Sequence, residues 1–233
     1  MCFLNGNRIK WKNNVFWEEE EETTENKPIS DVVDVTYQIK GKTLPSNYLS
    51  LIASQMSLQF DWWDELDDIG LQVLIAGEEG NGWFRDQTPN AILYLSRRSR
   101  LVLRTPKQMY AQIKNLHNAK LNLGEHDIEL VFKHDKSINH SATLYSQHVL
   151  SDEDDELRFL EIVTLELDSL GIVCKKILCG KTRELIINNE KKLTRSLMLN
   201  DLSKEDSVKL QNKGLGNFQK LGCGIFVPYK SIS

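Results

Sequence analysis

One order of alternating patterns occurs twice along this chain, and it constrains the fold more than any other feature. Apolar residues at every second position have the period of a half-buried strand, and apolar residues three and four apart have the period of a helix. The first unit reads strand, helix, strand, strand, helix, strand at residues 31–41, 48–58, 70–78, 91–104, 105–116 and 126–132. The second unit repeats this order, with one additional strand, at residues 141–150, 151–171, 172–179, 183–189, 194–200, 203–213 and 223–229.

Capping residues predict where three of these helices begin and end. Thr105, Ser151 and Ser203 each stand at the start of a helical pattern, where a side-chain oxygen accepts hydrogen bonds from free N–H groups of the first turn. Gly171 and Gly214 follow the last two helical patterns. Glycine there allows the left-handed conformation that commonly ends a helix.

The repeated β-α-β-β-α-β order is typical of ferredoxin-like (RRM-like) domains. We therefore predict an α+β protein with two ferredoxin-like domains in tandem, at residues 31–136 and 137–233, the second with a C-terminal glycine-rich loop. Residues 1–30 are polar and acidic and follow neither period. We expect them to form a flexible N-terminal extension.

Composition and cysteine spacing exclude several classes of protein. The 233 residues are 40% hydrophobic, which is sufficient for a buried core. No apolar run reaches the roughly 18 residues of a membrane span, and no apolar stretch follows the N-terminal positive charges as in a secretory signal. None of the four cysteines forms a CxxC pair or has a histidine at metal-ligand spacing. We expect a cytoplasmic protein with reduced thiols, no metal site, no cofactor and no membrane contact.

The charged residues are segregated along the chain. Residues 87–124 contain seven Lys or Arg and no acid, whereas residues 151–168 contain eight acids and one Arg. Residues 18–22 are an unbroken run of glutamates. Basic segments that merge on one face of a fold attract polyanions such as nucleic acids. The same segregation is also compatible with ordinary solvated faces of helices and strands.

A glycine-rich segment at the C-terminus is the most informative motif. Gly214, Gly216, Gly222 and Gly224 surround Lys220 between a predicted helix and the last strand. Glycines let a backbone approach a phosphate closely, and a lysine adds positive charge. The order helix, loop, strand is neither that of a Walker loop nor that of a dinucleotide fingerprint. A helix cap followed by a glycine-bearing hairpin is the structural alternative.

With this loop before its last strand, the chain resembles the Cas-six family of CRISPR-associated endoribonucleases, in the RAMP superfamily. The resemblance is closest to a myxobacterial-type subfamily, and it covers residues 31–233. The segments that carry it are KGKTLP (40–45), LSRRSRLVLR (95–104), ATLYS (142–146) and LGCGIFVPYKSI (221–232). The last of these segments is the most specific.

The resemblance implies a function in prokaryotic antiviral defence. Such proteins bind the repeat in a CRISPR transcript and cut it into guide RNAs without a metal, by attack of the ribose 2′-hydroxyl on the adjacent phosphate. They often retain the 3′ hairpin of the guide RNA (crRNA) within an effector complex of other subunits. On this basis the RNA-binding residues would be Arg97, Arg98, Arg100, Gly214, Gly216, Lys220, Gly222, Gly224 and Lys230.

The catalytic position departs from the subfamily pattern. There, the segment that matches KGKTLP leads into an Asp-His pair, whereas this chain has Asn47 and Tyr48. A phenol is a poor base at neutral pH but can act as an acid or a hydrogen-bond donor. Tyr48, with Lys42 and Ser46 nearby, is our first catalytic candidate, and packing of Tyr48 against the sheet is the alternative. His140, which we expect on the first strand of the second domain, is the second candidate.

Two other hypotheses remain open on the sequence alone. The first is a subunit of the same fold that holds guide RNA in an effector complex without cutting it, and the departure at Tyr48 favours it. The second is a tandem ferredoxin-like interaction protein with no RNA function, in which the acidic segments 18–22 and 152–168 are partner surfaces. The other four histidines each match a surface or packing position better than a catalytic one.

Overall fold

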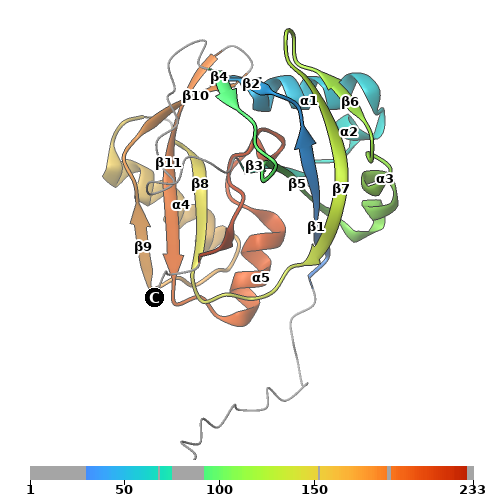
Figure 1. Ribbon diagram of the computed structural model, residues 1–233. Coiled ribbons are helices and arrows are strands. Elements are labelled where there is room, and N and C mark those ends of the chain that lie inside the picture. The colour runs from blue at the N-terminus through green and yellow to red at the C-terminus, as the bar shows by residue number, and fades with distance from the viewer. Residues whose placement is uncertain (1–29, 68, 75–91, 152, 188–189, 230–233) are drawn as a thin grey trace, which may run out of the picture.

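The structure is a computed structural model that describes residues 30–67, 69–74, 92–151, 153–187 and 190–229 (Figure 1). The predicted N-terminal extension, apart from Ser30, lies outside the described residues. The acidic run at 18–22, the segment that joins the predicted strands at 70–78 and 91–104, and Lys230 also lie outside the described residues. No helix in the described part of the chain has the length and apolar composition needed to cross a membrane.

The first half of the chain forms an antiparallel sheet, the N-terminal sheet. Its strands lie in the order β3 (Gly70–Leu74), β5 (Arg100–Pro106), β1 (Val32–Lys40), β7 (Asp127–Ser137) and β6 (Lys120–Asn122). Three α-helices and a 3₁₀ helix accompany it: α1 (Tyr48–Gln59), α2 (Trp62–Glu65), α3 (Tyr110–Lys114) and η1 (Lys107–Met109). A separate ribbon pairs β2 (Thr43–Pro45) with β4 (Ile92–Tyr94).

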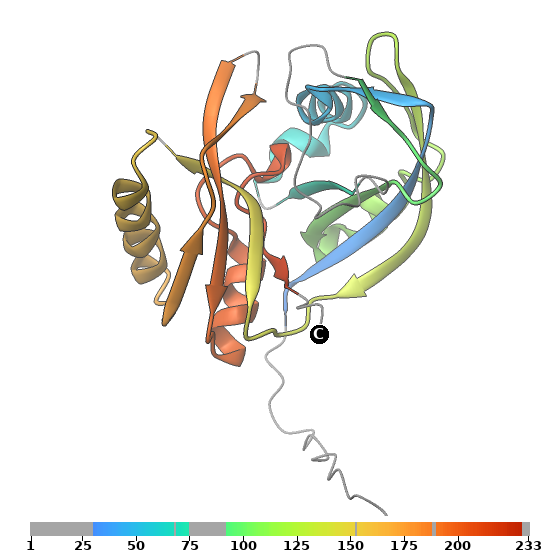
Figure 2. The ribbon, with the colours of Figure 1, turned by 60° about the vertical axis from the view of Figure 1, so that its left-hand side comes forward.

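The second half forms another antiparallel sheet, the C-terminal sheet. Its strands lie in the order β10 (Arg183–Ile187), β11 (Glu190–Asn200), β8 (Leu144–Ser151) and β12 (Val227–Pro228), and β9 (Lys176–Cys179) also pairs with β11. Its helices are α4 (Glu156–Ser169), α5 (Lys204–Lys213) and the 3₁₀ helix η2 (Gln219–Leu221). Helix α4 lies on the side of this sheet away from the N-terminal sheet (Figure 2).

A ferredoxin-like fold places the first and third of its four strands in the middle of the sheet. Both sheets follow this order when one additional strand is set aside in each, β6 in the N-terminal sheet and β9 in the C-terminal sheet. In the N-terminal sheet the two middle strands are β1 and β5, and in the C-terminal sheet they are β8 and β11. The prediction of tandem ferredoxin-like units is therefore confirmed. The domain boundary between residues 136 and 137 stays a prediction.

The period of two in β1 creates the N-terminal core. One face of this strand is buried at Val33, Val35, Tyr37 and Ile39. Across the ladder Val35 pairs with Leu103 and Tyr37 with Leu101, and both leucines are fully buried. The Tyr37 hydroxyl donates a hydrogen bond to the Ile113 carbonyl of α3. The sheet and its helices thus share one core, because alternate side chains of a strand point to the same face.

Several local expectations were wrong. The predicted strand at 91–104 is interrupted, because residues 95–99 leave the strand and Arg97 and Arg98 form a turn. Thr105 does not cap a helix but lies in β5, which continues to Pro106. Ser151 ends β8, and the side chain of Asp155 caps α4 instead by accepting from the Arg158 N–H.

Other capping predictions were correct. Ser203 caps α5, because its hydroxyl accepts a hydrogen bond from the Asp206 N–H at 3.0 Å. Gly171 and Gly214 follow α4 and α5 with left-handed φ angles of 62° and 69°. These three residues fix the ends of the two long C-terminal helices, as their types predict.

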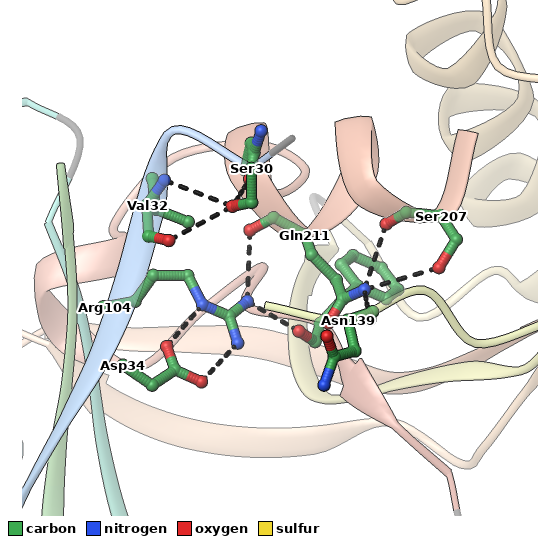
Figure 3. A network of polar contacts seen from close by, with 9 residues as sticks. Ser30, Val32, Asp34, Arg104, Asn139, Ser207 and Gln211 are labelled. Atoms are coloured by element: carbon green, nitrogen blue, oxygen red, sulfur yellow. Dashed lines mark hydrogen bonds and ion pairs between the residues drawn. The ribbon is translucent and has the colours of Figure 1, made fainter. Parts of the chain in front are cut away.

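A buried guanidinium joins the two halves of the molecule (Figure 3). Arg104 of β5 donates from Nε and Nη2 to the two carboxylate oxygens of Asp34 in β1, at 2.8 and 2.9 Å. Its Nη1 donates to the carbonyls of Gln211 and Phe226 in the second half of the chain, at 3.1 and 2.6 Å. The Arg104 side chain is only 6% exposed, so all of these groups depend on one another for their hydrogen bonds.

We predict that Arg104→Met lowers the free energy of unfolding by about 3–5 kcal/mol, because the partly buried carboxylate of Asp34 and two carbonyls lose their hydrogen bonds to the guanidinium. Urea unfolding followed by circular dichroism measures this change. Arg158→Met is the matched control. Arg158 forms an exposed ion pair with Glu161 at 3.0 Å, and its loss should cost no more than about 0.5 kcal/mol. Equal effects of the two substitutions would contradict the role given to Arg104.

Candidate functional site

The glycine-rich loop, residues 214–226, leaves α5 and runs between the two sheets to β12 (Figures 1 and 2). Gly214, Gly216, Gly222 and Gly224 all have left-handed φ angles between 66° and 82°. Non-glycine residues rarely adopt this conformation, so the spacing of the glycines follows the path of the backbone.

Three of these glycines are closed in by the protein itself. A Cβ atom on Gly224 would overlap the carbonyl oxygen of Leu215, and one on Gly214 would lie 2.6 Å from the Gly224 carbonyl oxygen. A Cβ on Gly222 would lie 3.2 Å from Leu49 of α1. Tight internal packing therefore explains why glycine occupies these positions.

Gly216 is different, because a Cβ atom there would meet nothing within 4 Å. The residue is exposed, and among the four glycines it is the one whose backbone is open to another molecule. A role of Gly214, Gly216, Gly222 and Gly224 in RNA binding stays a prediction.

Lys220, which belongs to this loop, is partly buried. Its ammonium group donates to the Trp63 carbonyl at 2.6 Å and lies 5.7 Å from the centre of the Trp63 ring. These contacts hold η2 against α2. An ammonium group has three donors, so the contact with Trp63 does not exhaust its capacity, and a contact of Lys220 with phosphate stays a prediction.

A cavity of about 170 Å³ opens between the two halves beside the loop. It is bounded by the first residues of α1, by β3, by β8 and by the end of the glycine-rich loop. Its lining is Tyr48, Leu49, Leu71, Gln72, Val73, Leu74, Tyr145, Gln147, His148, Gly222, Ile225 and Val227. None of these residues is a lysine, arginine or carboxylate, so the polar groups here are phenols, amides and one imidazole.

Tyr48 is the first residue of α1 and is 3% exposed. The residue before it, Asn47, makes no side-chain capping bond to the helix. Tyr48 both packs in the N-terminal core and lines the cavity. The packing expected as the alternative for Tyr48 is therefore present, and a catalytic role for this residue stays a prediction.

His148 also lines the cavity, although the sequence pattern favours a surface or packing role for it. A register shift in the pairing of β8 with β11 places Gln147 and His148 opposite the single residue Ser196, which is a β-bulge. Before the bulge Leu144 packs in the C-terminal core, and after it Val149 does. The bulge therefore changes which alternate residues face the core, and His148 comes to the same side of β8 as Tyr145.

A contact of His148 and the raised pKa of Tyr145 define the chemistry of the β8 side of the cavity. The Nδ1 atom of His148 lies 3.1 Å from the Thr194 hydroxyl of β11. Burial raises the pKa of Tyr145 to about 12, and the nearby Tyr229 also raises it, whereas a hydrogen bond to Ser196 and the charge of Arg183 lower it. Tyr145 is therefore a hydrogen-bond donor at neutral pH rather than a base.

The structure separates His140 from Tyr48. His140 does not lie on the first strand of the second unit as expected, because β8 begins at Leu144. Its neighbours are held against α5: the Asn139 carbonyl accepts from Gln211, and the Ser141 N–H donates to Ser207. The linker between β7 and β8 runs along the lower edge in Figure 1, whereas α1 lies at the top.

The other two catalytic candidates are close to Tyr48 in sequence. Ser46 is in the turn that leads into α1, and Lys42 is exposed on the connection between β1 and β2. Among the described residues that line the cavity, neither is present. Catalytic roles for Lys42, Ser46 and His140 stay predictions.

The three predicted RNA-binding arginines are at an exposed turn. Arg97 and Arg98 are both exposed, so neither side chain lies in a core. Arg100 begins β5, and its Nη1 donates to the carbonyls of Arg97 and Ser99 at 2.8 and 2.9 Å. Arg100 thereby stabilises the turn that presents the other two. Within the described ranges, no group of three or more His, Cys, Asp or Glu could hold a metal ion.

We predict that Gly224→Ala destabilises the protein far more than Gly216→Ala. Alanine in place of Gly216 has to adopt only the left-handed backbone conformation, which costs about 1–2 kcal/mol in the free energy of unfolding. At Gly224 it must also displace the backbone of Leu215, so we expect a loss of about 4 kcal/mol or more in the free energy of unfolding. Urea unfolding of both variants tests this, and equal losses would show that Gly224 is not closed in.

Comparison with known proteins is consistent with this geometry. The family model described as Cas6 Crispr matches residues 33–231. A relative from Myxococcus xanthus (strain DK1622), named CRISPR-associated endonuclease Cas6, is 26% identical over 197 residues, which are 84% of this chain and 81% of that protein. This organism agrees with the expected myxobacterial-type resemblance.

Solved structures show the same fold at lower identity. A protein described in "Characterization of a Cas6-related gene from Pyrococcus furiosus" has a TM-score of 0.55 and 15% identity, covering 84% of this chain and 98% of that one. A second, "An RAMP protein binding different RNA substrates", has a TM-score of 0.54 and 12% identity, covering 85% and 99%. The match of the family model over most of the chain shows that this protein belongs to the Cas6 family.

Proposed function

We propose that this protein binds the repeat sequence of CRISPR transcripts and cuts the precursor into guide RNAs. Membership of the Cas6 family supports this proposal, as does the name of the Myxococcus relative as an endonuclease. The observation that carries it is the cavity beside the glycine-rich loop, in which Tyr48 and His148 come from different halves of the chain. A site built from both halves suits a substrate that lies across them.

The proposed reaction is metal-independent. The ribose 2′-hydroxyl attacks the adjacent phosphate, and the products are a 2′,3′-cyclic phosphate and a 5′-hydroxyl. This chemistry needs a group that accepts the 2′ proton, a group that protonates the leaving oxygen and donors for the charge on the phosphate. We assign the protonation of the leaving oxygen to the Tyr48 phenol, since a phenol is protonated at neutral pH.

The RNA would enter along basic and exposed surfaces. The turn with Arg97 and Arg98 offers two exposed guanidinium groups for phosphates, and the open backbone at Gly216 allows close approach. We infer that the protein retains the 3′ hairpin of the guide RNA and passes into an effector complex with other subunits. Since the substrate is a cellular transcript, the protein acts in the prokaryotic cytoplasm.

The second candidate function is a non-cleaving subunit that holds guide RNA in an effector complex. The observation in its favour is Tyr48, at the position where the subfamily resemblance implies a histidine. The arginines and the glycine-rich loop would then serve binding alone. The two functions differ in one measurable property, the production of cut RNA.

We predict that the purified protein cleaves an unprocessed repeat RNA in the presence of EDTA. The upstream product should carry a 2′,3′-cyclic phosphate, which phosphatase removes only after acid opening of the ring. Tyr48→Phe should reduce single-turnover cleavage by about 100-fold, at the lower end of what a positioned proton donor contributes, while affinity for the repeat stays the same. Denaturing gels and filter binding measure the two properties.

Tyr94→Phe is the control for this prediction. Tyr94 in β4 is 78% exposed and is not in the lining of the cavity, so loss of its hydroxyl should not alter cleavage. Tight binding of the repeat with no cleavage by the unmodified protein would instead establish the non-cleaving subunit. Failure to bind the repeat at all would refute both candidate functions.

A further inference from the structure

We propose that His148 is the general base of the cavity and accepts the proton of the ribose 2′-hydroxyl. This inference rests on the proposed function and adds a residue that the position of Tyr48 alone does not indicate. Three observations carry it: the β-bulge that turns His148 toward the cavity, the contact that orients its ring, and the chemistry of the other groups in the lining.

The bulge gives His148 its position. Because two residues of β8 face one residue of β11, the strand continues after the bulge with its faces exchanged. Leu144 and Val149 both pack in the C-terminal core despite their odd separation. Without the bulge, His148 would share a face with Leu144 and point into that core. Bulges often redirect a side chain at a functional site.

Contacts on two sides then fix the residue. The backbone carbonyl of His148 accepts a hydrogen bond from the N–H of Gly224 at 2.6 Å, which ties the bulge to the glycine-rich loop. The ring Nδ1 lies 3.1 Å from the Thr194 hydroxyl. A hydrogen bond at one ring nitrogen selects the tautomer and orients the other nitrogen. Because Nδ1 contacts Thr194, we assign the proton transfer to the other ring nitrogen, Nε2.

The neighbouring titratable groups make poor bases. The phenols in the lining are Tyr48 and Tyr145, and burial raises the pKa of Tyr145 to about 12. The thiol of Cys223, between two loop glycines, has a pKa raised by burial to about 12. Arg183, which influences Tyr145 electrostatically, has a guanidinium group with hydrogen-bond donors only and no acceptor. Imidazole is the group in this set whose ordinary pKa, about 6.5, lies close to neutral pH.

The proposed step transfers two protons and exchanges one bond to phosphorus for another. His148 Nε2 takes the proton of the 2′-hydroxyl, and the 2′ oxygen forms a bond to phosphorus. The bond between phosphorus and the 5′ oxygen breaks, its electron pair stays on that oxygen, and Tyr48 supplies the proton that makes a 5′-hydroxyl. Proton exchange with water then restores both side chains. No oxidant, reductant or metal takes part in this step.

The test compares His148→Asn with His126→Asn. The amide of asparagine can keep the contact with Thr194 that Nδ1 makes but has no counterpart of Nε2, so the substitution removes the proposed base. His126 is the matched control, because its Nδ1 also contacts a threonine hydroxyl, that of Thr43, at 2.7 Å, and it is outside the cavity lining. Both variants should bind repeat RNA as the unmodified protein does, and unfolding curves check that both are folded.

We expect His148→Asn to lose at least about 100-fold in single-turnover cleavage and to lose the rise of the rate with pH below neutrality. His126→Asn should keep both. A substrate with a 5′-thiolate leaving group needs no protonation of that group, so the defect of His148→Asn should persist with it. Full recovery on this substrate would identify His148 as an acid and overturn its assignment as the base.

Two other results would also overturn the inference, and they differ from a failure of the proposed function. If the unmodified protein cuts the repeat and folded His148→Asn cuts equally well, His148 is not the base, while the proposed cleavage stands. If the unmodified protein binds the repeat and never cuts it, the cleavage function fails and with it any catalytic role for His148. Partial recovery of His148→Ala by added imidazole would support the assignment independently.

Discussion

The arrangement of the two sheets depends on the hydrogen bonds of one buried guanidinium, that of Arg104. It forms a two-point ion pair with Asp34 within the N-terminal sheet and reaches across to two carbonyls of the second half. Gln211 is in the helix before the glycine-rich loop, and Phe226 ends that loop. One side chain therefore holds both ends of the loop. Because a buried charge without its partners is strongly unfavourable, these segments keep their relative positions together.

The glycine-rich loop, held at its two ends in this way, forms one side of the cavity that Tyr48 and His148 line. Gly222 approaches Leu49 and the Leu71 carbonyl, which brings the loop against the start of α1 and against β3. The Gly224 N–H bonds to the His148 carbonyl, which brings the same loop against the bulge in β8. Tyr48 and His148 thus face one cavity because the loop touches the elements that carry both. The internal packing of the glycines therefore shapes this cavity.

The sequence predicts the order of elements well and the details of two strands poorly. Alternation in β1 and the Ser203 cap of α5 are local signals, and both were correct. Leucines at 93, 95, 101 and 103 keep one parity, and this alternation predicts a strand through Arg97. The turn arises from reciprocal bonds of Ser96 with Ser99, at 3.0 Å each, which alternation does not reveal. Periodicity does not reveal the β8 bulge either, so the sequence pattern does not indicate His148 and wrongly predicts that His140 lies on a strand.

In the proposed complex, the scissile phosphate of the repeat RNA lies in the cavity between Tyr48 and His148. The direct measurement is a crystal structure of the protein with a repeat RNA that carries a single 2′-deoxy substitution at the cleavage site and so cannot be cut. The scissile phosphate should be found beside Gly222, with the 2′ carbon facing His148 and the leaving oxygen facing Tyr48. A scissile phosphate on the α5 side of the molecule, near His140, would contradict this placement.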